Sequence, residues 1–494
     1  MHVLLNPGAV RKLELVNILK SHDGFHAVMD LGAKLGVTKT TLRKSLNELA
    51  EDLPNCDVRV QLVYEESSHR HVKLINSKSN LNHRLTSYYL QQEYSFKAFL
   101  DIFNNPDHDF KQFYEGEFVS LSTAYRETGK MKRILKKFDL KLDYTQAFPI
   151  KGTERQLRYF YACFFWSAYD ENYWCFNEPR LRIENLISHL EKNKYLFVPP
   201  IEREFFIMWT AIVIERLRTG NSGINHNAKK ISLGPTETEE LEAALAFVIH
   251  EWQLEAPKRL ELELELKNLI VVRNLFTTEI SDGFLETLEN SQLNQVVSQI
   301  VAKIEEALTI KLTQGQREFM YTHLLVLHSK KYFFVGEPSD FYIREKKSEL
   351  EQVRYEIKTF VYEKIRALDT SLAYRNLVED SETLASAYFE VLLKMLRMEP
   401  ANLKLKVGIF TIEEERGVWR NQRYAELAWF DPIEFVTDFS APRDVNLSDR
   451  YFKHISEMSA ELFVISSQPT EAELGELGLI YWQITFQKIK DLFK

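Results

Sequence analysis

Cationic and hydroxyl side chains recur at helical spacing in the first third of the chain. Within the segment 32–49, one helical face carries Lys39, Thr40, Arg43 and Lys44. Ammonium, guanidinium and hydroxyl groups donate hydrogen bonds to phosphate oxygens and to the acceptor edges of bases, and such contacts make and break no covalent bond. We therefore predict that this face binds an anionic polymer.

A second segment, 121–138, is richer in positive charge. A solvated helix face also carries lysines, but here a single carboxylate, Glu127, balances six cations. This excess favours a helix that faces phosphate groups. The six cations are Arg126, Lys130, Lys132, Arg133, Lys136 and Lys137.

A helix-turn-helix would position the first cationic face. Gly32 is small where two helices cross, Gly36 can adopt the positive φ of a tight turn, and Thr38 can cap the second helix. We interpret this second helix as a recognition helix. Its apolar face is predicted from Leu35, Val37, Leu42, Leu46 and Leu49.

Two alternating, β-branched runs follow, at 58–64 and 71–75, and residues 65–70 join them. They predict a hairpin, so that the first unit is a winged helix. Arg70 at the wing tip is a candidate for the minor groove, and a merely solvated Arg is the alternative. For the whole unit, a winged helix that contacts protein is the alternative to one that binds DNA.

The second unit follows the same plan. We predict a helix over 109–117, a short turn, a helix over 121–138 capped by Ser122, and a wing from 140–144 and 148–152. The candidate core residues of its second helix are Leu121, Ala124, Tyr125, Ile134 and Leu135.

Histidines in the helical middle of the chain are candidates for modification. Residues 203–210 align without a gap on 317–324, an offset of 114, which predicts two tandem helical domains. In this register His323 and His328 replace apolar residues of the first copy. A histidine near neutral pH is a nucleophile that phosphoryl donors modify. We take His323 first and His250 and His328 after it, with an ordinary hydrogen-bonded histidine as the alternative for each.

The last part of the chain alternates strands and helices. Strand patterns at 403–410, 434–439 and 461–467, with helices around 419–427 and 449–458 and a last helix, predict a parallel sheet. The loop after the first strand has no glycine-rich cradle and no cysteine, so we expect no catalysis there. Trp419, Trp429 and Phe430 are candidates for a dimer face, with core packing as the alternative.

Composition limits the possible classes of protein. The net charge of −8 is uneven: residues 1–160 hold 24 Lys+Arg against 19 Asp+Glu, or +5, and the remainder holds 39 against 52, or −13. A basic amino-terminal third suits local phosphate binding. Three scattered cysteines exclude a disulfide framework and fit a reducing cytoplasm. We expect no secretion signal, no membrane span, no cofactor and no metal.

The order of these parts resembles the Mga/AtxA family of virulence transcription regulators from Gram-positive bacteria. The most specific segments are FVSLSTAYRETGKMKRILKKF (118–138) and IKGTERQLRYFYACFFW (150–166). The resemblance implies a cytoplasmic regulator, an activator or global regulator, that binds double-stranded DNA and links sugar supply to gene expression. It also implies two phosphotransferase-regulated domains (PRDs), a phosphodonor protein from the sugar phosphotransferase system, and dimerisation through a last domain similar to that system's IIB component.

This chain departs from the family pattern at two places. The PRD phosphoacceptor pattern, Asp-His-Ile-x-Phe-Ala, is matched loosely at 322–327, and its histidine is absent at 208–213. The IIB cysteine is replaced by Thr411 and Ile412, which argues against phosphotransfer there.

The predicted fold is multidomain and mainly α. Its parts are a winged helix-turn-helix at 1–80, a second helix-turn-helix at 81–170, PRD-like helical domains at 171–285 and 286–400, and a IIB-like α/β domain at 401–494.

Three other functions compete with that of a DNA-binding regulator. No nucleotide loop, zinc-ligand spacing or nucleophile elbow supports an enzyme. An RNA-binding antiterminator is an alternative because PRDs also occur in such proteins, and a protein-interaction scaffold is another. Because the recognition helices are rich in Lys and Arg, we also predict that binding depends mainly on DNA shape.

Overall fold

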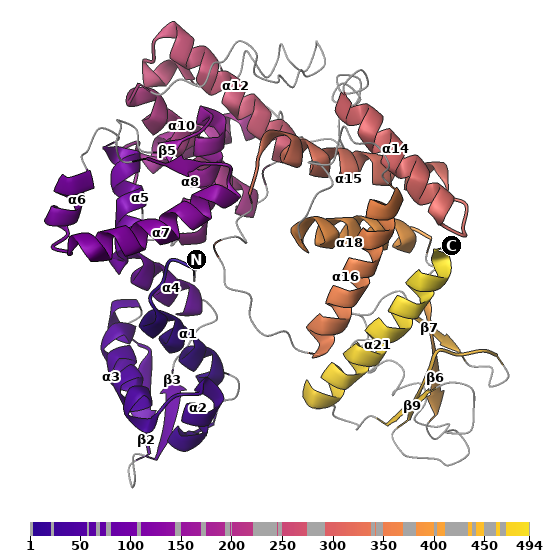
Figure 1. Cartoon of the computed structure of the whole chain (residues 1–494). Helices are drawn as coiled ribbons and strands as arrows, with labels where there is room; N and C mark the ends of the chain where they lie inside the picture. Colours follow the sequence, from indigo (N-terminus) through magenta and orange to yellow (C-terminus); the bar gives the residue numbers. More distant parts are fainter. Residues whose placement is uncertain are drawn as a thin grey trace. The chain divides into compact units, whose positions relative to one another are not determined.

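The protein is mainly helical in the computed structural model (Figure 1). Among the described residues, no helix combines the length and apolar character needed to cross a membrane. The structure describes residues 3–20, 24–56, 59–65, 70–75, 81–105, 110–143, 150–168, 174–192, 198, 200–220, 245, 249–273, 292–336, 341, 349–368, 382–399, 403–410, 433–436, 441–448, 461–464 and 471–493.

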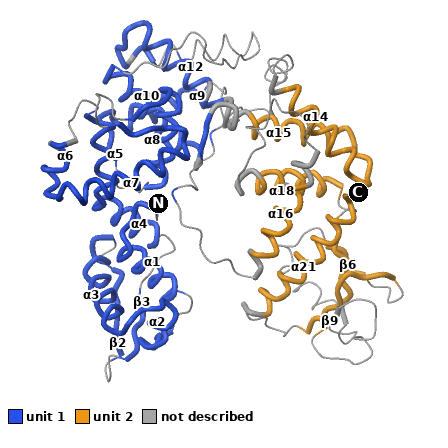
Figure 2. Tube along the Cα trace, in the orientation of Figure 1, with its two compact units in different colours: residues 1–283, 333–344 blue, residues 284–332, 345–494 orange. Residues whose placement is uncertain are grey.

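The chain divides into two compact units (Figure 2). Unit 1 comprises residues 1–283 and 333–344, and unit 2 comprises residues 284–332 and 345–494. Unit 1 is therefore discontinuous in sequence, because a short segment returns to it after a stretch of unit 2.

The first part of unit 1 contains three helices and a three-stranded antiparallel sheet, the arrangement of a winged helix. Buried leucines on three helices form its core, and β3 pairs antiparallel with both β1 and β2. Leu35 and Val37, which we expected in the core, are only half-buried. The elements are α1 (Pro7–Leu19), β1 (His26–Ala27), α2 (Val28–Leu35), α3 (Lys39–Cys56), β2 (Gln61–Tyr64) and β3 (His71–Ile75).

The second part of unit 1 has an aromatic core. Phe96 stacks on Phe164 with ring centroids 4.9 Å apart, and the edge of Phe99 meets Phe160 at 5.1 Å. Aromatic rings from two helices thus lock α5 to α8. The elements are α4 (Leu81–Gln92), α5 (Tyr94–Asn104), α6 (Phe110–Gly116), α7 (Leu121–Lys137), β4 (Lys141–Leu142), β5 (Ile150–Lys151) and α8 (Glu154–Ala168).

Two helix pairs repeat at the offset of 114 residues that the sequence indicates. Arg203 lies 2.5 Å from Glu191, and Arg317 lies 2.9 Å from Glu305, so each pair joins equivalent positions. Ile214, in the register position of His328, is fully buried like that histidine. The first pair is α9 (Arg180–Lys192) and α10 (Pro200–Arg218), and the second is α14 (Gln292–Ala307) and α15 (Gln314–Phe333).

Among the described residues, four further helical elements flank these pairs. In unit 1 these are η1 (His250–Trp252) and α12 (Ala256–Arg273), and in unit 2 they are α16 (Glu349–Leu368) and α18 (Glu382–Arg397).

A buried ion network joins three helices of unit 1. The fully buried Arg158 of α8 lies 3.2 Å from Glu154 and 2.5 Å from Glu261 of α12. Arg216 of α10 lies 2.7 Å from the same Glu154. Charges removed from water need such partners, so the network fixes how these helices meet.

Unit 2 ends in the predicted parallel sheet, with strand order β7-β6-β8-β9. Strand β8 was not predicted. The predicted helices at 419–427 and 449–458, the loop with Thr411 and Ile412, and the aromatic residues Trp419, Trp429 and Phe430 lie outside the described residues. The strands are β6 (Leu405–Phe410), β7 (Ile433–Val436), β8 (Val445–Ser448) and β9 (Glu461–Val464).

Helix α21 (Glu471–Leu492) packs on two neighbours within unit 2. Its residues Leu477, Ile480 and Tyr481 belong to the core of the sheet. On the helical side, Arg397 donates to Tyr481 at 3.3 Å, and Phe389 lies 6.1 Å from Trp482, centroid to centroid. The sheet and α18 therefore both pack against α21.

Candidate nucleic-acid interface

The turn of the first helix-turn-helix has the geometry that its sequence predicts. Gly36 has a φ of 62°, and the Val37 amide donates to the Gly32 carbonyl at 3.0 Å. Thr38 Oγ1 accepts from the Thr41 amide at 3.3 Å and so caps α3. The turn therefore fixes the orientation of α3 relative to α2.

All four predicted contact residues of α3 are exposed. Lys39, Thr40, Arg43 and Lys44 share the face that points away from the buried leucines. Arg70 is also exposed, and its carbonyl accepts from the Val28 amide at 2.8 Å. Residues 66–69 of the wing tip lie outside the described part of the chain.

The second turn repeats the first at an offset of 82 residues. Phe118 has a φ of 55° where Gly36 has 62°. The Val119 amide donates to the Tyr114 carbonyl at 3.2 Å, and Ser120 Oγ accepts from the Thr123 amide at 3.3 Å. The N-cap is thus Ser120, and the prediction of Ser122 was wrong.

Burial on α7 also follows the register of α3. Ala124, Glu127, Thr128 and Met131 are buried, as are Leu42, Ser45, Leu46 and Leu49 at the same offset. Leu121 and Tyr125, predicted as core residues, are instead 47% and 64% exposed. They take the positions that Lys39 and Arg43 hold in the first unit.

Five of the six predicted cations of α7 are exposed, and Lys130 differs. Its side chain is only 20% exposed and lies 2.8 Å from Glu127. Glu127 also accepts from Ser95 of α5 at 3.1 Å. Lys130 therefore neutralises the buried Glu127, and Glu127 links α7 to α5. The five exposed cations are Arg126, Lys132, Arg133, Lys136 and Lys137.

The charge of Glu127 is held by its surroundings. Burial would raise the pKa of its carboxyl, but the hydrogen bond and charge of Lys130, with help from Ser95, lower the pKa below 4.5. The carboxylate consequently stays ionised and anchors the buried side of α7.

Residues 79–165, which contain this second unit, match the family model of the Mga helix-turn-helix domain. We call residues 79–165 the Mga domain after this match. A relative from Streptococcus pneumoniae serotype 4 (strain ATCC BAA-334 / TIGR4), named "Putative trans-acting regulator", is 23% identical over 192 residues. The match covers 38% of this chain and 37% of that relative, so the chain spans little more than a third of the relative's length. Together the two matches support the resemblance of this chain to the Mga family of regulators.

A segment that follows α15 packs against the Mga domain. Phe334 stacks on Tyr159 with centroids 4.3 Å apart, and Gln156 exchanges two hydrogen bonds with the backbone of Val335, at 2.7 and 3.1 Å. Phe341 is fully buried against Phe138, 5.5 Å between centroids. We call residues 334–336 and 341 the strap. It completes the aromatic core of the Mga domain.

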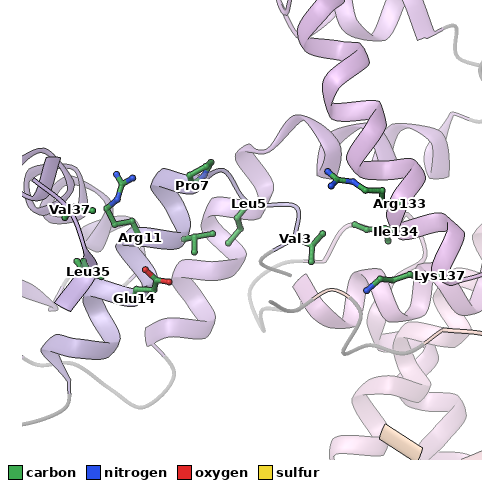
Figure 3. A pocket seen from close by; sticks show the side chains of 11 residues that line it. Val3, Leu5, Pro7, Arg11, Glu14, Leu35, Val37, Arg133, Ile134 and Lys137 are labelled. Carbon is green, nitrogen blue, oxygen red and sulfur yellow. The ribbon is translucent and has the colours of Figure 1, made fainter. Parts of the chain in front are cut away.

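A cavity of about 630 Å³ lies where the first winged helix meets α7 (Figure 3). Leu35 and Val37 line it from the first turn, which explains why they are half-buried. Arg133 and Lys137 line it from α7, and Arg11 lines it from α1. The two helix-turn-helix units therefore line this cavity together.

The three candidate histidines differ in access. His323 is half-buried, and its Nδ1 donates to the Phe319 carbonyl at 2.8 Å, so that Nε2 is the acceptor atom of the neutral ring. His328 is fully buried, with Nε2 2.5 Å from the Tyr388 hydroxyl. His250 is exposed in η1. Among the described residues, no cluster of His, Cys, Asp and Glu could hold a metal ion.

Proposed function

We propose that the protein is a DNA-binding transcription regulator that contacts double-stranded DNA through α3 and α7. The observation that carries the proposal is the shared register of the two turns, because each presents an exposed cationic helix at the same place in its unit. Recognition helices of this kind lie in the major groove, and their cations neutralise phosphates. The Mga domain and the regulator name of the relative support the same function.

A salt titration tests the proposal. Binding of fluorescent duplex DNA would be measured at several salt concentrations for the wild type, for Arg43→Ala/Lys44→Ala and for Arg126→Ala/Arg133→Ala. We expect a steep loss of affinity with salt, and a slope reduced by about 0.9 for each phosphate contact removed. Lys111→Ala is the matched control, because Lys111 is an exposed cation of α6 that lies 3.9 Å from Glu115.

Two outcomes would overturn this proposal. Salt-insensitive binding, or binding unchanged in both double variants, would favour a protein-interaction scaffold. Tighter binding of single-stranded or hairpin RNA than of duplex DNA would favour an antiterminator.

The proposed regulation is phosphorylation of His323 by a phosphodonor protein of the sugar phosphotransferase system. His323 lies in the second of two repeated helix pairs, is partly accessible, and has an available Nε2. Its helix, α15, ends at Phe333, and the strap begins at the next residue. A phosphate on His323 would therefore add negative charge to the helix whose chain continues into the strap and so into the core of the Mga domain.

Mass spectrometry after incubation with such a phosphodonor tests this step. We expect an acid-labile phosphate that is lost in His323→Ala and kept in His250→Ala and His328→Ala. A phosphate retained in His323→Ala would reject His323 as the acceptor.

The proposed mode of action is activation of transcription by a homodimer formed through the last domain. This part rests on the family resemblance. Sedimentation of the full chain would give the oligomeric state, and a monomer across micromolar concentrations would reject the dimer. Transcription from a bound promoter in a purified system would distinguish activation from repression.

A further inference from the structure

Three large apolar side chains lie exposed within eight residues of the Mga domain. Phe118 is 96% exposed, Leu121 47% and Tyr125 64%. Ten large hydrophobic residues are exposed in the described part of the chain, so three of the ten fall in this one turn and helix start. We call Phe118, Leu121 and Tyr125 the apolar cluster.

The position of Phe118 is unfavourable for folding. Its φ of 55° is a left-handed conformation that residues with a Cβ rarely adopt. The equivalent residue of the first unit is Gly36, which adopts the same φ without strain. An exposed phenylalanine gains no burial that would offset the strain. A strained residue that its own fold does not require indicates an external contact.

The place of the apolar cluster on the helix-turn-helix indicates the partner. Residues at the amino-terminal end of a recognition helix reach the edges of the bases. Leu121 and Tyr125 lie in the first turns of α7, at the register positions of Lys39 and Arg43. Exposed cations follow on the same helix. The partner therefore carries negative charge, and it presents an apolar group where it meets the apolar cluster.

One apolar group faces the major groove of DNA, the 5-methyl group of thymine. We propose that the apolar cluster reads thymine methyl groups. The Mga domain would then select sites by direct contact, in place of the shape readout that the sequence led us to expect, while its cations bind the phosphate backbone. This inference rests on the proposed DNA-binding function. It gives the two units different roles, because α3 presents cations at the positions where α7 presents apolar side chains.

Uracil tests the inference because it lacks only the 5-methyl group of thymine. A 30-base-pair duplex would be selected from a randomised pool with the full chain, then prepared with thymine and again with uracil. We expect the wild type to bind the uracil duplex about fivefold to tenfold more weakly. Leu121→Ala and Phe118→Gly should bind both duplexes with nearly the same affinity.

Two controls distinguish a loss of thymine recognition from a loss of folding and from a loss of positive charge. Phe118→Gly relieves the strained φ, so its thermal stability should equal or exceed that of the wild type while its thymine preference falls. Lys136→Ala should weaken binding of both duplexes by the same factor and keep their ratio.

Each outcome decides a different claim. Equal wild-type affinity for the two duplexes would overturn thymine readout and leave DNA binding intact. A thymine preference that survives in both variants would assign the apolar cluster to another partner, such as a protein surface. An absence of salt-dependent binding to either duplex would overturn the proposed function itself.

Discussion

Gly336 of the strap lies against the ring of Phe138, the C-cap residue that follows α7. A Cβ atom on Gly336 would lie 2.6 Å from Phe138 Cδ1, closer than such atoms can approach. The φ of Gly336 is +89°, which side chains other than glycine's rarely tolerate. The chain that leaves α15 therefore reaches the end of a recognition helix at a point where only glycine fits.

We expect Gly336→Ala to destabilise unit 1 by about 2 kcal/mol, because it combines backbone strain with overpacking against Phe138. Thermal unfolding would measure the change. Gly129→Ala is the matched control, since Gly129 lies inside α7 where an added methyl group would meet no atom within 4 Å, and this variant should gain up to about 1 kcal/mol. Equal stability of the two variants would show that the strap does not hold the Mga domain.

Arg158→Met should destabilise the protein by about 3–5 kcal/mol, because it removes the central cation of a buried network that contains the carboxylates of Glu154 and Glu261. Chemical denaturation would give the free energy of unfolding. In the double variant Arg158→Met/Glu261→Gln we expect a smaller loss than the sum of the single changes. Additive losses would mean that the two residues do not interact.

The pKa of Glu127 predicts an acid-sensitive Mga domain. Because this carboxyl has a lowered pKa in the folded state, its contribution to stability is present above pH 4.5 and is lost as the pH falls through the folded pKa. Glu127→Gln should be less stable than the wild type at pH 7 and depend less on pH below 4.5. Glu115→Gln, at an exposed carboxylate, should keep the wild-type pH profile. A profile unchanged in Glu127→Gln would contradict this assignment.

Substitution of Lys130 should affect mainly stability, whereas substitution of Lys136 should affect mainly DNA binding. Lys130→Ala breaks the 2.8 Å pair with Glu127, so we expect lower thermal stability. Lys136→Ala removes an exposed cation, so stability should stay within about 0.5 kcal/mol while the salt slope of DNA binding falls. The opposite pattern, a stable Lys130→Ala and an unstable Lys136→Ala, would reject this division of roles.

Local signals were sufficient for the first helix-turn-helix. Gly36 and Thr38 specify the turn and the cap through their own backbone and hydroxyl chemistry, so the start of α3 could be predicted. In the second unit the short turn was also predicted, but Phe118 takes the place of the glycine, so the residue type did not indicate the positive φ. Ser120 and Ser122 are equally suitable caps by residue type, and only the backbone geometry distinguishes them.

Periodicity alone could not separate core from contact surface on α7. Leu121 and Tyr125 fit an apolar helical face, but they lie on its exposed side. Comparing the two units at the offset of 82 would have shown this, because Lys39 and Arg43 hold the equivalent exposed positions. Strand β8 was missed for a different reason: its four residues, Val445–Ser448, give too short an alternation to be recognised, although all four are buried.

The contacts of the strap imply an order of events during synthesis. The aromatic core around Phe138 and Phe164 is complete only when Phe341 has joined it. At a translation rate of about 5–20 residues per second, Phe341 leaves the ribosome on the order of 10 s after Phe164. During that interval the aromatic core of the nascent Mga domain lacks Phe341, so the apolar surface that this residue later covers stays exposed to water.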